Sequence, residues 1–187
     1  VIWANARANP LAVGASMRYL SVHLLGGVIL MLGITVHISS SGSTDITAMK
    51  ADNLGTWLIL IGFLINAGAP PLSSWIADAY PEASPSGTVF LSAFTTKTAV
   101  FALLMCFPGE TVLIYVGLYM VFYGIIYALL ENDMRRILAY SIVNQVGFML
   151  VAIGIGSELA LNGAAAHAFA HIKIKKKIHN IFKFSNI

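Results

Sequence analysis

The chain has 187 residues, of which 58% are hydrophobic and only 10% are charged. Soluble domains carry about 25% charged residues, so this composition leaves too little polar surface to cover a soluble globule. Its one cysteine, Cys106, excludes a disulfide or a cysteine-based metal site within the chain. Phosphate-loop, dinucleotide and Ser-His-Asp motifs are missing from the sequence, so we expect no cofactor.

Apolar stretches long enough to cross a membrane recur along the chain. At 1.5 Å per residue each spans a hydrocarbon core of about 30 Å, and the expected spans are Tyr19 to Ile38, Leu54 to Trp75, Thr88 to Phe107, Thr111 to Leu130 and Ile137 to Ile155. A sixth begins at Leu159 and meets Lys173 after about 14 apolar or small residues, fewer than a span needs. Strand-period alternation is absent, which favours an all-α integral membrane fold: a polytopic helical bundle.

Basic residues gather on one side of this topology. If the spans alternate, the same side receives Arg7, Arg18, Arg135, Arg136, Lys173, Lys175, Lys176, Lys177 and Lys183, and only Lys50 falls on the other. By the positive-inside rule, we expect the N-terminus, the Asp78/Glu82 loop and the Arg135-Arg136 loop to be cytoplasmic. The excess of basic residues therefore indicates membrane topology, and nucleic-acid binding is not expected.

Lys97 is the clearest candidate functional residue. It lies in the run LSAFTTKTAVFALL, about 14 Å along its helix from Thr88 and so near the bilayer midplane. Snorkelling does not easily carry its ammonium to either interface from there. The alternative is a structural lysine paired with a carboxylate, but the expected spans contain no Asp or Glu. Because ionisable residues inside a membrane are rare and usually functional, we predict a transport role.

The segment INAGAPPLSSW predicts a broken helix. Pro70 and Pro71 have no N–H, so the carbonyls of Asn66 and Ala67 lose their helical partners. Freed carbonyls beside the Asn66 side chain would make a hydrated site within the membrane, as in the discontinuous helices of transporters. The alternative is an ordinary proline kink in a packed bundle.

Two histidines occur in AAAHAFAHI. His167 and His171 are four residues apart, which places them on one helical face, and imidazoles relay protons near neutral pH. A metal site would need at least a third ligand, which nothing obvious supplies. The alternative is a structural role in hydrogen bonds between helices.

Other polar residues in the spans are less informative. In AYSIVNQVGFM, Ser141, Asn144 and Gln145 either extend a polar path or only bond helix to helix. His23 and His37 lie nearer to span ends and carry less weight.

Three segments together resemble a known family. They are APPLSSWIADAYPEASPSGTVFLSAFTTKTAV, ALLENDMRRILAYSIVNQVGFM and NGAAAHAFAHI, and they are similar to the antiporter-like membrane subunits of respiratory NADH:quinone oxidoreductase. They resemble most of all the D subunit of Mrp-type multisubunit cation/proton antiporters. The resemblance implies part of a fourteen-helix fold, in which Lys97 is the conserved lysine of the eighth helix. It also implies that Pro70-Pro71 breaks the seventh helix and that His167 and His171 belong to the central proton pathway.

The chain departs from the family pattern in places. The family usually has lysine where this chain has Asn66, and often histidine where it has Gln145. The family's fifth-helix glutamate would lie upstream of Val1, and its later helices also fall outside the chain, which is therefore expected to be a truncated fragment. Residues 1–172 are expected to be a partial proton-conducting antiporter transmembrane domain. Residues 173–187 shift abruptly to a Lys-rich composition, which we interpret as an aberrant, frameshifted tail; the alternative is a polybasic segment at an anionic membrane surface.

The resemblance implies a membrane-subunit fragment for proton translocation, in a monovalent cation (Na⁺ or K⁺)/proton antiporter of a bacterial inner membrane. The alternatives are the homologous proton-pumping subunit of NADH:quinone oxidoreductase and a nonfunctional gene remnant. In each case the chain is not expected to be an enzyme in itself. The expected partners are other membrane subunits, the lipid bilayer, protons and Na⁺ or K⁺.

Overall fold

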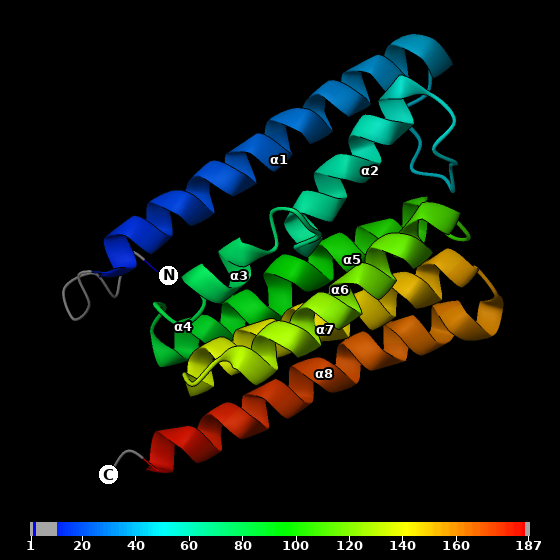
Figure 1. The fold of residues 1–187 in the computed structure, drawn as a ribbon. Helices are drawn as coiled ribbons and strands as arrows, with labels where there is room; N and C mark the ends of the chain where they lie inside the picture. Colours follow the sequence, from blue (N-terminus) through cyan, green and yellow to red (C-terminus); the bar gives the residue numbers. More distant parts are fainter. Residues whose placement is uncertain (1, 3–10, 186–187) are drawn as a thin grey trace.

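The structure is a computed structural model that describes residue 2 and residues 11–185, with the backbone alone for 85 and 174–185. Throughout this part of the chain the ordered elements are helical, as predicted (Figure 1). In chain order they are α1 (Leu11–Ser41), α2 (Leu54–Ala67), α3 (Ser74–Ala79), α4 (Pro85–Phe90), the π-helical turn η2 (Leu91–Thr95), α5 (Thr96–Cys106), α6 (Thr111–Leu130), α7 (Met134–Ile155) and α8 (Glu158–Ser185).

Four continuous helices in the described residues are long and apolar enough to cross a membrane: α1, the stretch Ser86–Cys106, α6 and α7. The remaining expected span, Leu54 to Trp75, is divided between α2 and α3. The chain is therefore a multi-pass membrane protein with one broken helix. The helix α8 continues through Lys173 without interruption, although the apolar stretch ends there.

The helix α7 forms the centre of the bundle, because it packs against α3, α5, α6 and α8. Its buried side chains include Val143, Val146, Met149 and Leu150. By contrast α1 packs against α2 and α3 on one flank of the bundle (Figure 1). Most of its large apolar side chains are exposed. The bundle thus has a densely packed side around α7 and an apolar, exposed side along α1.

Close packing of α6 against α7 depends on small residues. A Cβ added at Gly147 would lie 2.7 Å from the carbonyl oxygen of Gly117 and 2.9 Å from the backbone nitrogen of Val121. In membranes the hydrophobic effect does not drive apolar helices together, because lipid is as apolar as their surfaces. Association between helices therefore relies on close packing of their backbones. These glycines therefore set the distance between α6 and α7, and so the position of the polar residues on α7.

Basic residues are gathered at one end of the bundle. Arg18 on α1 pairs with Asp78 on α3, and Arg135 Nη1 donates a 2.9 Å hydrogen bond to the Pro81 carbonyl. Arg7 lies outside the described residues, as do the side chains of the lysines after Lys173. The grouping of Arg18 and Arg135 agrees with the alternation of spans inferred from the sequence.

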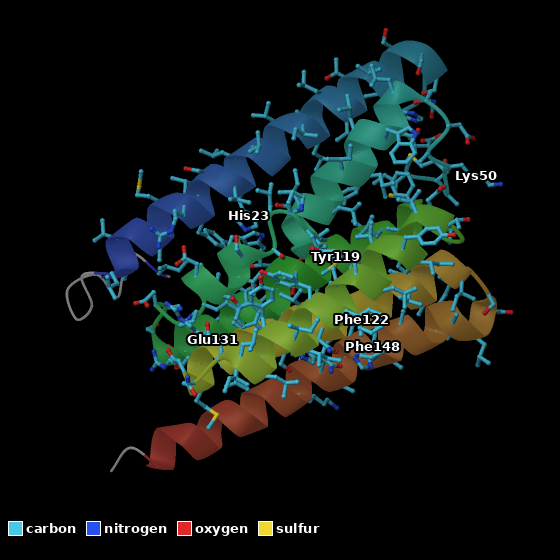
Figure 2. The ribbon with its side chains drawn as sticks, in the orientation of Figure 1. His23, Lys50, Tyr119, Phe122, Glu131 and Phe148 are labelled. Carbon is cyan, nitrogen blue, oxygen red and sulfur yellow. The ribbon has the colours of Figure 1, made fainter. Side chains whose placement is uncertain are left out.

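The segment that carries Lys50 lies at the opposite end. Met49 N–H donates to the Cys106 carbonyl at 2.7 Å, and Ala51 N–H donates to the Glu110 carboxylate at 3.2 Å. Figure 2 shows Lys50 in this segment and Glu131 at the other end of the bundle. The long loop between α1 and α2 is thereby fastened to the α5–α6 connection.

We predict that Gly147→Ala lowers the stability of the bundle by about 1–3 kcal/mol, because the added methyl group must displace the α6 backbone. The measurement is reversible unfolding in detergent micelles. Gly27→Ala is the matched control, since a Cβ at Gly27 meets nothing within 4 Å. Equal stability of the two variants would contradict the assignment of α6–α7 packing.

We predict that cysteines placed at Thr111 and at Asn132 react with impermeant maleimides from opposite sides of the membrane, because the two sites are separated by the length of α6. The native Cys106 is replaced by Ala to remove its thiol. Thr111 is chosen over Gly109, whose φ of 79° disfavours a side chain. Labelling of both positions from the same side would show that α6 does not span the membrane.

Candidate functional site

The break between α2 and α3 is formed by a glycine cap. Gly68 is in the left-handed conformation with φ 85°. Its N–H donates to the Ile65 carbonyl at 3.1 Å, and the N–H of Ala69 donates to the Leu64 carbonyl at 2.9 Å. This is the Schellman arrangement, which satisfies carbonyls left over at the end of a helix. Trp75 Nε1 adds a 3.3 Å bond to Ile65 O from across the break.

The predicted opening of this helix is confirmed, because α2 ends at Ala67. The physical cause differs from the expectation. The helix ends at Gly68, before Pro70 and Pro71, which lie in the connection to α3 and are joined by a cis peptide bond. The sequence contained the signal for this ending, since glycine just after a helix with proline shortly beyond is a common stop.

Asn66, in the last turn of α2, meets a histidine from α1. His23 Nδ1 lies 2.7 Å from Asn66 Oδ1. The imidazole packs against two aromatic rings, with ring centroids 4.2 Å away for Tyr19 and 4.7 Å away for Trp75. Sequence reasoning gave His23 little weight. Its partner is 43 residues away, and no local pattern reveals such a contact.

A cavity of about 400 Å³ opens beside this pair, where α1 and α2 face η2 and α5. Its polar lining consists of His23, Asn66, Thr95 and Thr98. Its apolar lining consists of Phe63, Phe94, Ala99 and Ala102. A cavity of this size with several hydrogen-bonding groups has room for water molecules.

Lys97 is buried in the bundle, with 6% of its surface exposed. It lies in the first turn of α5, and its Nζ donates a 3.2 Å hydrogen bond to Thr96 Oγ1. The π-helical turn η2 immediately precedes it, and such turns inside α-helices often occur at functional sites. The helix that carries Lys97, α5, packs against α2 on one side and against α7 and α8 on the other.

A second polar pair links α7 and α8. His167 Nε2 lies 2.7 Å from Gln145 Oε1, and the ring of His171 is stacked 6.5 Å from that of His167. His171 is buried, with 7% of its surface exposed. Asn144 instead donates a 3.3 Å bond to the Val121 carbonyl and so joins α7 to α6. Both residues therefore bond between helices, Asn144 to α6 and Gln145 to α8.

The described residues contain no group of three or more His, Cys, Asp or Glu side chains placed to hold a metal ion. The two polar pairs lie on different helices. One joins α1 to α2, and the other joins α7 to α8, with α5 in contact with three of these four helices. Of the predicted residues, Gln145 thus pairs with His167, whereas Asn66 pairs with His23, which was not in the predicted set, and Lys97 is in neither pair.

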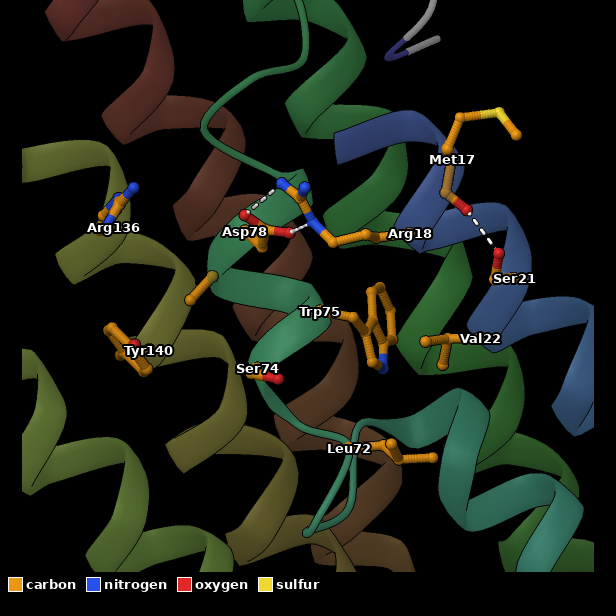
Figure 3. Close-up of a pocket in the computed structure, with 11 residues that line it drawn as sticks. Met17, Arg18, Ser21, Val22, Leu72, Ser74, Trp75, Asp78, Arg136 and Tyr140 are labelled. Atoms are coloured by element: carbon orange, nitrogen blue, oxygen red, sulfur yellow. Dashed lines mark hydrogen bonds and ion pairs between the residues drawn. The ribbon is translucent and has the colours of Figure 1, made fainter. Parts of the chain in front are cut away.

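A larger cavity of about 550 Å³ lies at the basic end, between α1, α3 and α7 (Figure 3). Arg18 forms two bonds with the Asp78 carboxylate, of which the Nη2–Oδ1 bond is 2.9 Å, and Trp75 lies beside them. The Arg18 side chain is 61% exposed, so solvent screens the pair and it contributes about 1 kcal/mol or less. Its structural effect is to hold α3 against α1, which keeps Trp75 beside His23.

The chain is similar to known membrane subunits. It shares 29% identity over 170 residues with NADH-quinone oxidoreductase subunit M of Pseudomonas aeruginosa, covering 84% of this chain and 33% of the relative. It is 27% identical to the D subunit of the Na(+)/H(+) antiporter of Alkalihalophilus pseudofirmus, covering 86% of this chain and 36% of the relative. The solved Mrp complex from Dietzia sp. DQ12-45-1b matches with a TM-score of 0.81 and 28% identity, over 88% of this chain and 34% of the matched chain.

The chain spans about a third of the length of these relatives. Residues 1–185 match the family model described as NADH:quinone oxidoreductase/Mrp antiporter, TM. The resemblance inferred from the three segments, which contain Lys97, the Arg135-Arg136 loop and the paired histidines, is thus confirmed at the level of the family. The chain belongs to the transmembrane family shared by NADH:quinone oxidoreductase and Mrp antiporters.

Proposed function

We propose that this chain carries part of the proton pathway of a membrane subunit in a monovalent cation/proton antiporter, which exchanges protons for Na⁺ or K⁺. The observation that carries the proposal is Lys97, an ionisable side chain buried in an apolar bundle. Such a group is costly to bury and is most often retained because it takes part in ion movement. Its helix, α5, packs against helices of both polar pairs.

Within this pathway Lys97 holds and releases a proton, and the two pairs extend the path on either side. His167 and His171 supply the protonatable groups on α8, and Gln145 orients His167 because its Oε1 accepts a bond from the ring N–H. On the other side, Pro70 and Pro71 keep α2 from continuing into α3 after Gly68. The side chain of Asn66 is thereby left at a helix end beside the cavity.

Antiport is favoured by the similarity to the D subunit of an antiporter and to the solved Mrp complex. A second candidate is proton pumping in an NADH:quinone oxidoreductase, supported by the similarity to the M subunit of that enzyme. In that case the redox chemistry would occur in other subunits, and this chain would still act as a transporter component. Both candidates require other membrane subunits as partners and place no cofactor in this chain.

The proposal assigns the pathway to residues 1–172 and leaves the Lys-rich residues 173–187 outside it. It also orients the chain in a bacterial inner membrane. Arg18, Arg135 and Arg136 lie at one end of the bundle, and an excess of Arg and Lys near the ends of spans favours the cytoplasmic side.

Replacing Lys97 with Met tests the proposal, because methionine keeps much of the apolar stem but cannot titrate. We expect coupled transport to fall at least about tenfold in a complete subunit that carries these segments. Lys97→Arg should fail as well, since a guanidinium stays protonated. The assay is proton efflux from everted membrane vesicles, with complex assembly verified by blue native electrophoresis.

Lys50→Met is the matched control, because Lys50 is an exposed lysine in the loop between α1 and α2. It should transport at the wild-type rate. Normal transport by an assembled Lys97→Met subunit would refute the proton-carrying role and show that Lys97 is purely structural.

The broken helix provides a separate prediction. Changing Gly68, Pro70 and Pro71 together to Ala removes the left-handed cap and restores the two backbone N–H groups that proline lacks. We therefore expect α2 to continue beyond Ala67. We expect transport in the complete subunit to fall while the protein remains in the membrane. Slower amide hydrogen exchange at residues 68–71 would establish helical continuity. Full transport with a continuous helix would show that the break serves packing only.

A further inference from the structure

We propose that His23 is an additional protonatable residue of the pathway, set in a fixed tautomer by Asn66 and exchanging its proton with water in the adjoining cavity. The inference rests on the proposed proton translocation and extends it to α1, a helix to which none of the sequence-predicted site residues belongs. It starts from three observations: the pairing of His23 with Asn66, the state of the second ring nitrogen, and the cavity beside them.

The contact with Asn66 determines which ring nitrogen carries the proton. Asn66 Oδ1 is an acceptor, so His23 Nδ1 must donate across the 2.7 Å separation. In the neutral ring, the lone pair is then on Nε2. A neighbouring group that fixes one nitrogen of a histidine in this way decides the chemistry of the other.

The second nitrogen is buried. Nε2 of His23 is shielded from solvent and has no hydrogen-bond partner among the described residues. Leaving a buried acceptor unsatisfied is unfavourable, so a hydrogen-bond donor such as a water molecule that reaches Nε2 is bound favourably. His23 lines the cavity of about 400 Å³, from which such a donor would approach.

The groups that face His23 leave it as the ionisable member of this cluster near neutral pH. On α1 its neighbour is Tyr19, and on α3 it is Trp75. On α2 it is the neutral Asn66, and across the cavity η2 and α5 present the neutral hydroxyls of Thr95 and Thr98. The charges nearest to this cluster in sequence are Arg18, paired with Asp78, and Lys97.

The exchange is a simple proton transfer. A hydronium ion in the cavity gives its proton to Nε2 and becomes water, while Nδ1–H stays bonded to Asn66 Oδ1. The resulting imidazolium later returns the proton from Nε2 to a cavity water. The Thr98 hydroxyl donates to the Phe94 carbonyl, and its oxygen can still accept a hydrogen bond from that water.

The tautomer is measured by ¹⁵N solid-state NMR of the chain, with labelled histidine, in lipid bilayers. The His23 signal is identified by its loss in His23→Gln. We expect a ring protonated at Nδ1 at pH 8 that gains a second proton by pH 5, and we expect Asn66→Leu to abolish the preference for Nδ1. His37→Gln, on the same helix, should leave the His23 signal unchanged. A ring protonated at Nε2, an unaltered tautomer in Asn66→Leu or no second proton by pH 5 would overturn the inference.

Transport in a complete subunit separates this inference from the proposed function. We expect His23→Gln to reduce coupled transport at least about tenfold and to change its pH profile. If Lys97→Met loses transport while His23→Gln keeps it, the proposed function stands and the role of His23 is refuted. If Lys97→Met transports normally, the proposed function fails, whereas the NMR experiment still decides the tautomer and titration of His23.

Discussion

The need to satisfy every backbone polar group within an apolar bundle governs this structure. In lipid an interrupted helix exposes carbonyls that water cannot reach, so a break persists only where the protein supplies donors. At the end of α2 those donors are the N–H groups of Gly68 and Ala69 and the indole of Trp75. The break is thus stabilised by specific hydrogen bonds. It leaves the Asn66 side chain beside the cavity, where it bonds to His23.

The same constraint explains how distant polar residues are coordinated. Trp75 is held near the break by its bond to Ile65, and its helix is held to α1 by the Arg18–Asp78 pair. The ring of Trp75 then packs against His23 and confines the imidazole on one side. The exposed Arg18–Asp78 contact and the buried Trp75–His23 contact thus join the same two helices, α1 and α3.

Much of the fold follows from composition and hydropathy, because length and apolarity alone determine which segments can cross a bilayer. The broken helix and the place of Lys97 midway along the continuous stretch Ser86–Cys106 were also predictable, since proline chemistry and residue spacing are local. The cap at Gly68 has a local signal as well, although the prolines beyond it were expected to cause the break. The pairs His23–Asn66 and Gln145–His167 were not predictable from spacing. They join residues 43 and 22 positions apart, and they depend on how helices pack.

Packing distances decide whether such pairs form at all. The glycines between α6 and α7 bring those backbones close enough that Asn144 reaches the Val121 carbonyl. With Asn144 committed to α6, the neighbouring Gln145 is directed to another face of α7, where it meets His167 on α8. Adjacent residues on α7 thus bond to two different neighbouring helices, because successive positions of an α-helix point in different directions.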